Sequence, residues 1–357
     1  MPKLLISSDL HLSMQEKEYS LSVLDEIIKH AENYDALLLL GDTFNTFEDL
    51  QELKDIFSQK LENYQKNVLL LKGNHENLKS KGITLDKLKF PNNVIVIENI
   101  SFFNVDNLDI IALPYNEKYI IDNELNNKIE NLNADIRIVI GHGIVEGTLW
   151  AIEENEELAI IPIDIIKKIE PNIAVIGHIH KQMEVNIENT EIIYTGSARI
   201  WRRSKSEMGV RRCLALDIQG SSINKTFIDI KSAGEYRVYE YNIHGIDSKL
   251  DEAAKKWNAN DIIDINIYGI AEDENEVEEK KSIIKNKYSK YARDINIKIN
   301  ELFLLENAYN ESIIKEFIDI ATEYEFETNN EEDLEIVELA KRLGIEKISA
   351  ALSNKKR

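Results

Sequence analysis

Histidine, aspartate and asparagine residues follow directly after apolar runs at five points of the sequence. These segments contain Asp9 and His11, Asp42, Asn74 and His75, His142, and His178 and His180. They hold five of the seven histidines in the chain. Imidazole, carboxylate and amide groups are metal ligands, so this concentration predicts a metal site. Taken alone, Asp42 would be interpreted as the cap of a following helix.

The ligand types narrow the choice of metal and its chemistry. A mixture of imidazole, carboxylate and amide suits Mn²⁺, Fe²⁺ or Zn²⁺ better than Ca²⁺ or Mg²⁺, which favour oxygen-only sites. There are enough side chains for two ions, and two ions ~3.5–4 Å apart are the usual apparatus for hydrolysing phosphate esters. Asp42 stands alone in its turn and is the candidate to bridge the two ions.

Parallel strands would bring these side chains together. Residues 3–7, 36–40 and 68–71 are predicted strands, with helices over 18–32 and 46–61, and this order indicates a parallel sheet with a binding edge at its carboxyl ends. Further strands are predicted at 94–97, 101–105, 110–113, 136–140, 173–176, 192–195, 213–218 and 226–230, and helices at 119–132 and 163–169. Their mixed patterns predict an α/β (α+β) fold, a two-sheet β-sandwich flanked by helices.

The pattern changes near residue 233. Residues 1–232 are predicted to form the domain with the metal site, 233–300 a small α/β capping domain, and 301–357 a helical C-terminal segment. The small domain alternates strands at 236–243, 262–268 and 294–299 with helices at 248–257 and 275–288. In the acidic C-terminal segment, apolar residues recur at helical spacing along 331–343, and this face would pack on the chain itself or on a partner.

The charge and composition bear on partners and location. The net charge is −21, whereas nucleic-acid binders usually present a basic face, so DNA binding would depend on a local basic patch, metals or a partner. No apolar segment approaches the length of a membrane span, and the N-terminus begins a strand instead of a signal peptide. The single cysteine, Cys213, excludes an intramolecular disulfide and is expected in the core. These features predict a cytoplasmic protein without a membrane partner.

Five motifs occur in a fixed order, namely Asp9-Leu10-His11, Gly41-Asp42, Gly73-Asn74-His75-Glu76, Gly141-His142 and Gly177-His178-Ile179-His180. The ordered set resembles the calcineurin-like metallophosphoesterases, whose fold is a β-sandwich flanked by helices. The resemblance implies one metal ion bound by Asp9, His11, Asp42 and His180, and another bound by Asp42, Asn74, His142 and His178. It further implies that a metal-bridging hydroxide attacks phosphorus, while His75 contacts the phosphate and protonates the leaving oxygen. Glu76 would orient His75 or cap a helix.

Within that superfamily, the sequence resembles the DNA repair nucleases of the SbcD and MRE-eleven type. The similarity lies in the strand at 262–269 with the helix and strand after it, in the turn Tyr194-Thr195-Gly196-Ser197, and in a basic cluster of Arg199, Arg202, Arg203, Lys205, Arg211 and Arg212. It implies a Mn²⁺-dependent exo- or endonuclease of DNA repair or recombination, a homodimer, and an SbcC-type ABC ATPase partner docking at 331–352. Arg199, Arg202 and Arg203 would contact phosphate or DNA, unless the cluster is a solvated loop.

The substrate remains open at this point. Asn45 occupies a position where MRE-eleven-like members carry a histidine that assists exonuclease chemistry, and Thr195 replaces a proline of that group. The alternative is a phosphodiesterase or phosphatase for a small nucleotide or other metabolite, which the negative charge favours. A non-catalytic scaffold is disfavoured, because every ligand position is filled.

Overall fold

The computed structural model describes residues 2–116, 118–148, 159–187, 189–304 and 312–325, together with 336–337, 339–341, 343–345 and 347–348. The chain forms two compact units, Met1–Tyr236 and Arg237–Arg357. Most of residues 331–352, where a partner is predicted to dock, lie outside the described residues.

The first unit contains a six-stranded sheet built around parallel strands. Its order is β15 (Ser222–Asp229), β14 (Arg212–Gln219), β1 (Lys3–Ser7), β2 (Ala36–Leu40), β3 (Asn67–Leu71) and β4 (Val94–Ile97). Strands β1 to β4 are parallel, and β14 joins β1 in the antiparallel sense. The parallel core agrees with the β-α-β-α-β order that the sequence predicts.

A second six-stranded sheet has the same kind of core. Its order is β11 (Met183–Ile187), β12 (Thr190–Tyr194), β10 (Ile173–Gly177), β7 (Ile136–His142), β6 (Leu108–Leu113) and β5 (Ser101–Val105). Strands β12, β10, β7 and β6 are parallel, while β11 and β5 are antiparallel edges. A separate pair is formed by β8 (Ile144–Val145) and β9 (Ile160–Ile161).

The alternation of side chains along β2 explains why its sequence is wholly apolar. Leu38 and Leu40 belong to the core between the two sheets, where they join residues of the second sheet such as Ile138. Leu37 and Leu39 belong to the core on the outer face, beneath helices α1 (Lys17–Ala31) and α2 (Phe47–Tyr64). A strand covered on both faces needs apolar residues at every position.

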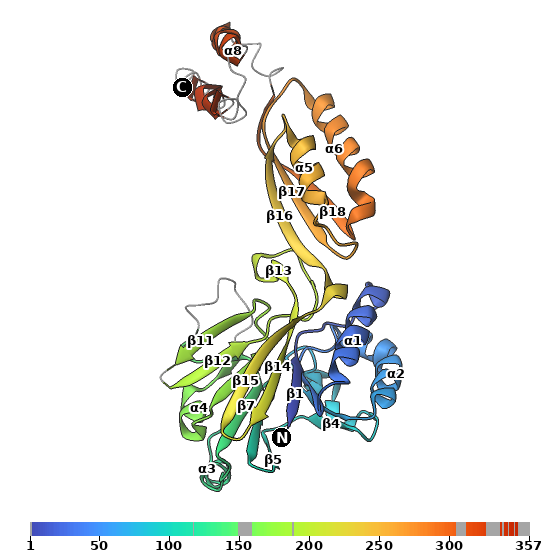
Figure 1. The fold of residues 1–357 in the computed structure, drawn as a ribbon, viewed down its shortest axis with the longest axis vertical. Helices are drawn as coiled ribbons and strands as arrows, with labels where there is room; N and C mark the ends of the chain where they lie inside the picture. The colour runs from blue at the N-terminus through green and yellow to red at the C-terminus, as the bar shows by residue number, and fades with distance from the viewer. Residues whose placement is uncertain are drawn as a thin grey trace. The chain divides into compact units, whose positions relative to one another are not determined.

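Helices also cover the outer face of the second sheet. These are α3 (Asn123–Glu130) and α4 (Ile163–Ile169), and their apolar residues Leu125 and Ile166 pack with Val139 of β7. Figure 1 shows α1 and α2 beside the strands of the first sheet, and α3 and α4 beside the other sheet. The predicted two-sheet sandwich flanked by helices is confirmed.

The second unit is a small α/β structure. Strands β16 (Glu235–Asn242), β17 (Ile262–Ala271) and β18 (Asp294–Leu304) lie side by side, with β17 and β18 parallel. Helices α5 (Ile246–Ala254) and α6 (Glu274–Tyr288) contribute Leu250 and Ile284 to a core with Ile265. Short strand β13 (Gly209–Val210) pairs with the first residues of β16, Glu235 and Tyr236.

The C-terminal part of the second unit has its own apolar cluster. Ile314 and Ile318 of α8 (Ser312–Glu325) pack with Ile345 and with Ile270 of β17. The helical residues Ile336 and Leu339, by contrast, are 63% and 49% exposed. The described part of the chain therefore leaves this portion of the apolar face at 331–343 uncovered.

Two differences from the sequence prediction have a clear local cause. Strand β11 is absent from the prediction because it is an edge strand in which Val185 is the only buried residue. The helix predicted over 119–132 is shorter, because Asp122 caps the start of α3 through a 2.8 Å bond from the Leu125 amide. Tyr119 instead lies buried before the helix, with its hydroxyl bonded to the Pro114 carbonyl.

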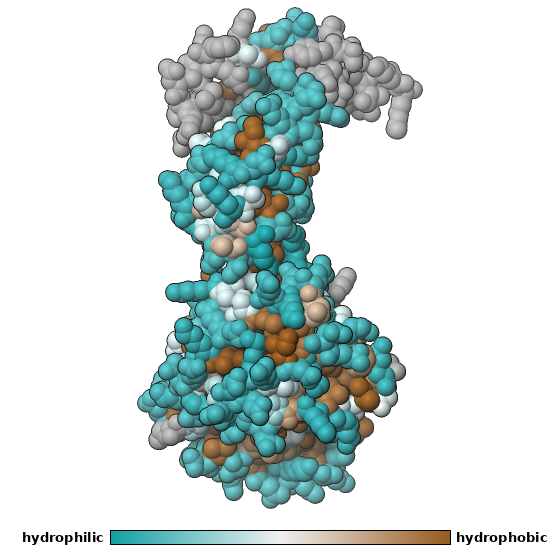
Figure 2. Space-filling model, turned by 90° about the vertical axis from the view of Figure 1, so that its right-hand side faces the viewer, coloured by the Kyte–Doolittle hydropathy of each residue, from teal (hydrophilic) through white to brown (hydrophobic). Residues whose placement is uncertain are grey.

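The surface is largely polar. Most of the face drawn in Figure 2 is hydrophilic, with smaller groups of apolar side chains between the polar ones. Across the described residues, no helix combines the length and apolar character needed to cross a membrane.

Candidate metal centre

The loops after β1 and β2 hold the first three candidate ligands. Beyond the strand ends, the two loops continue to pair, because the amide of Asp9 donates to Gly41 (3.1 Å) and that of His11 donates to Asp42 (2.9 Å). The amide of Leu12 donates in turn to Thr43 (2.8 Å). Asp9, His11 and Asp42 are therefore held by an extension of the sheet, and all three are buried.

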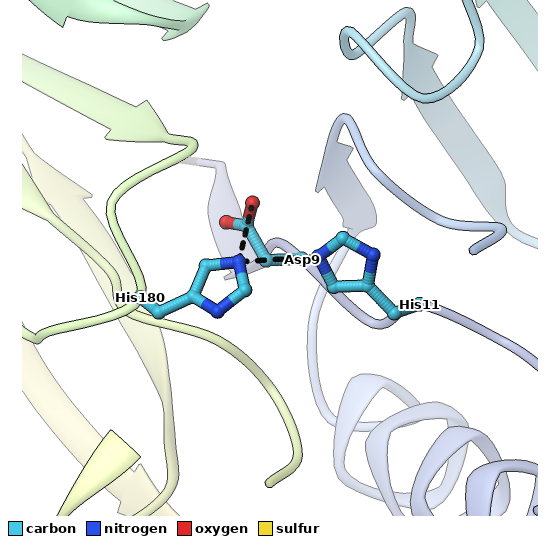
Figure 3. Close-up of side chains that lie close together, drawn as sticks. All are labelled: Asp9, His11 and His180. Atoms are coloured by element: carbon cyan, nitrogen blue, oxygen red, sulfur yellow. Dashed lines mark hydrogen bonds and ion pairs between the residues drawn. The ribbon is translucent and has the colours of Figure 1, made fainter. Parts of the chain in front are cut away.

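The first group of possible ligands joins the two sheets. It comprises Asp9, His11 and His180, whose ligand atoms lie within 4.8 Å of one another. The Nε2 atoms of His11 and His180 are 3.1 Å apart, and Nε2 of His180 lies 3.8 Å from Oδ1 of Asp9. Figure 3 shows His180 meeting Asp9 and His11 from a different loop.

The second group lies around Asp42. Asp42, His142 and His178 again have ligand atoms within 4.8 Å of one another. Oδ2 of Asp42 is 3.4 Å from Nε2 of His142. Oδ1 of Asn74 lies 3.0 Å from both Nε2 of His142 and Nδ1 of His178. The structure thus brings together all seven residues that the sequence predicts as ligands.

His75 lies beside Asp42. Its Nε2 atom is 4.0 Å from Oδ2 of Asp42, and it forms a third group with Asp42 and His11. A hydrogen bond on the other side of the ring fixes its orientation. Nδ1 of His75 lies 2.5 Å from the carbonyl oxygen of Asn45, to which it must donate. Asn45, the residue at which the sequence departs from the MRE-eleven pattern, therefore contributes its backbone to the site.

The ligand loops are strained. Asp9, His11, Asp42 and His178 have φ angles of 51°, 44°, 49° and 92°. Non-glycine residues with such positive φ angles cost about 1–3 kcal/mol each. Only seven described non-glycine residues have positive φ, and four of them are candidate ligands, so the strain is concentrated at the site.

The glycines of the motifs allow close approach of the loops. Gly41 has a φ of 84°, and a Cβ atom there would collide with the ring of His142. A Cβ atom on Gly73 would collide with the carboxylate of Asp42, and one on Gly177 with the Leu40 carbonyl. These contacts explain why glycine precedes the ligands in sequence.

Glu76 braces two of the loops. Its buried carboxylate accepts hydrogen bonds from the amides of Asp42 (2.9 Å), Phe44 (2.9 Å) and Gly73 (3.0 Å). Burial and then the nearby Asp42 carboxylate raise the pKa of Glu76 to about 7. This role differs from both alternatives that the sequence leaves open, orientation of His75 and capping of a helix.

Glu207 is a supporting residue that the sequence analysis does not identify. Oε1 of its buried carboxylate lies 2.6 Å from Nδ1 of His180, and Oε2 accepts a 2.7 Å bond from Ser197. A carboxylate behind a histidine fixes the ring and makes it a stronger ligand. Glu207 lies 27 residues from His180 in sequence, and no spacing rule links the two.

The structure corrects the prediction for Arg199. This residue is fully buried, so it cannot contact phosphate or DNA. Its Nε atom donates to the carbonyls of Leu10 (2.7 Å) and His11 (3.1 Å), and Nη1 forms a 2.6 Å ion pair with Glu16. Arg199 therefore supports the loop that carries Asp9 and His11.

Three further members of the basic cluster divide into two kinds. Arg211 is also buried, and it donates to the His180 carbonyl (3.2 Å) and the Met208 carbonyl (2.8 Å). Arg202 is exposed and Arg203 is half-buried, so these two remain candidates for contacts to phosphate.

The electrostatics suit metal ligands. Burial, followed by the charge on His180, lowers the pKa of His11 well below its usual value, so His11 is a neutral imidazole, the form that binds metals. Burial raises the pKa of Asp9. Burial alone would lower the pKa of His142, but the carboxylates of Asp42 and Asp9 raise it to about 9. A cation would replace that proton and compensate the buried carboxylates.

The donor set fits two divalent cations. Two imidazole nitrogens and a buried carboxylate face one another in the first group, and two further imidazoles, Asn74 and Asp42 do so in the second. Asp42 belongs to the second group and also lies next to the first, because it forms a further group with His11 and His75. The site is that of a metal-dependent hydrolase with a dinuclear centre.

Comparison with known proteins identifies the family. The model of the family described as calcineurin-like phosphoesterase matches residues 2–182, which is half of the chain. The chain belongs to this family and is a metal-dependent phosphoric ester hydrolase. A search of curated proteins finds no match.

Several solved structures are similar. One is a dimetal phosphatase from Danio rerio, with 10% sequence identity and a TM-score of 0.43, where the match covers 64% of this chain and 97% of that one. Another is a protein of Thermus thermophilus, with 12% identity and a TM-score of 0.41, where the match covers 63% of this chain and 98% of that one. A novel archaeal phosphodiesterase is also similar, with 15% sequence identity and a TM-score of 0.34, where the match covers 63% of this chain and 99% of that one.

Proposed function

We propose that this phosphoesterase is a Mn²⁺-dependent DNA nuclease of the SbcD type that acts in DNA repair or recombination. The observation that carries the phosphodiesterase chemistry is the pair of ligand groups meeting at Asp42, with His75 beside them. The choice of DNA as substrate rests on the resemblance in sequence and on the residues around this site.

The proposed residue roles follow from the contacts. Two bound divalent ions would supply Lewis-acid polarisation of the phosphoryl oxygens and a nucleophile at neutral pH. Asp9, His11, Asp42 and His180 would hold one ion, and Asp42, Asn74, His142 and His178 the other. His75 donates from Nδ1 to the Asn45 carbonyl, which leaves Nε2 directed toward Asp42. A proton on Nε2 would then be available to the leaving oxygen.

Two observations support a nucleic-acid substrate. Arg202 and Arg203 directly follow Trp201, whose ring contacts His11 and His75, so cationic side chains lie close in sequence to the site. Phosphate contacts from arginine would position a backbone without reading its bases. The small α/β unit after Tyr236 has strand β17, helix α6 and strand β18, the three elements on which the resemblance to the SbcD type depends.

The same proposal includes a homodimer and an SbcC-type ABC ATPase as partners. The ATPase would dock on the C-terminal segment, where Ile336, Leu339 and Leu343 are spaced by three and four residues and are 63%, 49% and 45% exposed. That spacing places them on one face of a helix. An apolar helical stripe exposed to water suits a groove on another protein.

The second candidate is a phosphodiesterase or phosphatase for a small nucleotide or other metabolite. Two observations favour it, the net charge of −21 and the burial of Arg199 and Arg211. Their burial removes two cations from the surface that would hold a DNA backbone.

A hydrolysis assay separates the two candidates. Purified protein with Mn²⁺ would be given labelled single- and double-stranded DNA, with an aryl phosphodiester in parallel, and each substrate would be tested with and without the partner ATPase. The nuclease proposal expects cleavage of DNA and of the aryl ester, and loss of both in Asp42→Asn. Cleavage of the aryl ester but never of DNA would reject the nuclease and favour the metabolite enzyme.

A binding assay tests the docking proposal. Replacing Ile336, Leu339 and Leu343 by serine, or deleting residues 331–357, is expected to abolish capture of a co-encoded ATPase while hydrolysis of the aryl ester continues. Capture at wild-type strength by both variants would show that the ATPase, if it binds, uses another surface.

A further inference from the structure

His11 differs from its neighbours in how its ring is held. Nδ1 of His142 donates to the Leu40 carbonyl (2.7 Å), and Nδ1 of His180 is hydrogen-bonded to the Glu207 carboxylate (2.6 Å). Nδ1 of His11 is buried and has no hydrogen-bond partner among the residues that the structure describes. A ligand histidine usually has such a partner, which sets the orientation of the ring.

Trp201 lies against His11 instead. The two rings are stacked, with centroids 4.2 Å apart and planes inclined by 8°. Trp201 also meets His75 edge-on at 5.6 Å and His180 at 5.3 Å. Arg202 lies over the indole, with its guanidinium carbon 5.3 Å from the ring centroid. The indole is thus packed among the histidines and is itself half-buried.

We propose that Trp201 is a positioning residue that orients His11 for the metal by stacking, in place of the missing hydrogen bond. A flat contact over an entire imidazole face restricts rotation about the bond from Cβ to the ring, as a hydrogen bond to Nδ1 would. Stacked aromatic pairs are stabilised beyond what their buried area alone contributes. The proposal rests on the assignment of His11 as a ligand under the proposed function.

The test compares two leucine substitutions of tryptophan. Trp201→Leu removes the stacking partner, and Trp257→Leu is the matched control, because Trp257 packs in the second unit near Tyr239 and Tyr288. Mn²⁺ affinity and stoichiometry are measured on the full chain from the paramagnetic resonance of free Mn²⁺. Trp201→Leu is expected to weaken one of the two ions about 10- to 100-fold, with the other ion and the Trp257→Leu protein unchanged.

Trp201→Phe distinguishes stacking from simple filling of space. A phenyl ring can still lie flat on His11, so this variant is expected to recover most of the Mn²⁺ affinity. Fluorescence adds a measurement on the unmodified site. Mn²⁺ is expected to quench the tryptophan emission of the wild-type protein, and Trp201→Phe is expected to lose this quenching.

The outcomes separate this inference from the proposed function. If His11→Ala retains both ions, the ligand assignment is wrong and the inference falls with it. If His11→Ala loses an ion but Trp201→Leu binds both ions with wild-type affinity, the inference alone is wrong. A rise in KM with unchanged Mn²⁺ affinity would also contradict it, because it would make Trp201 a contact to substrate. If Trp201→Leu fails to fold, the inference is decided by the other measurements. It is wrong if Trp201→Phe binds Mn²⁺ much more weakly than the wild-type protein and Mn²⁺ does not quench the tryptophan emission of the wild-type protein.

Discussion

At the scale of single residues, the candidate metal site depends on buried residues that are not ligands themselves but hold the ligands and their loops in place. Arg199 holds the carbonyls of Leu10 and His11, Glu76 binds three amides of two loops, and Glu207 orients His180. These residues offset the strain of ligands with positive φ angles. Removing one of them should therefore affect folding as well as metal binding.

Arg199→Met is expected to destabilise the protein by about 2–4 kcal/mol. The substitution leaves buried carbonyls of Leu10 and His11 without donors, and each orphaned group costs about 1–3 kcal/mol. Urea unfolding of the metal-free protein measures the change. Arg202→Met is the control, and as an exposed substitution it should stay within about 0.5 kcal/mol of wild type. Equal stability of the two variants would show that Arg199 does not support the loop.

Cys213 should be unreactive in the native protein. Burial raises the pKa of its thiol to about 12, and the thiolate is the reactive form. Dithionitrobenzoate at pH 8 is expected to label the protein only on unfolding. In the unfolded chain this thiol ionises near its ordinary pKa, at lower pH than in the folded protein. The contribution of the buried neutral thiol to the free energy of unfolding is therefore complete below that ordinary pKa and is lost as the pH rises above it. Rapid labelling of the folded protein would contradict this.

At the scale of elements, parallel strands account for the position of the site. Strands β1, β2 and β3 of one sheet and β7 and β10 of the other end in ligand loops. Helix α2 starts just after the Asp42 loop. Thr46 caps it by accepting a 3.0 Å bond from the Asp49 amide, and Asp49 accepts a 2.6 Å bond from Met14 beyond the His11 loop. The helix cap thus also links the first two ligand loops.

Thr46→Ala is expected to cost about 1 kcal/mol in the free energy of unfolding, the usual value for loss of a side-chain cap. Thr46→Ser keeps the accepting hydroxyl and should lose much less. Urea unfolding of both variants provides the measurement. Similar losses in the two would indicate that the threonine methyl group, and not the cap, is what stabilises this end of α2.

The sequence predicts local features of the site and misses distant ones. The apolar run before Asp42 and the pairs spaced by two are visible along the chain, because strand ends and side-chain alternation are local properties. Trp201 and Glu207 carry no such signal, because their partners lie in loops that meet only in the folded sandwich. The prediction for Arg199 is wrong because charge in a sequence cannot reveal burial.

At the scale of the whole molecule, the two units have separate cores. Every candidate ligand and the supporting residues Arg199, Trp201 and Glu207 lie within Met1–Tyr236. Residues 1–236 are therefore expected to fold alone and to bind metal as the full chain does. Calorimetry and metal analysis of that fragment test this, and a fragment without a cooperative transition would show that the second unit is needed for folding.

The most direct test of the central claim is the metal content of the reconstituted protein. We expect about two Mn²⁺ ions per wild-type chain. Asp42→Asn is expected to show a clear loss of bound metal, because the Asp42 carboxylate adjoins both ligand groups. Elemental analysis after removal of free metal gives both numbers. A wild-type chain without bound metal, or an Asp42→Asn chain with the full wild-type content, would contradict the assignment of a dinuclear centre bridged by Asp42.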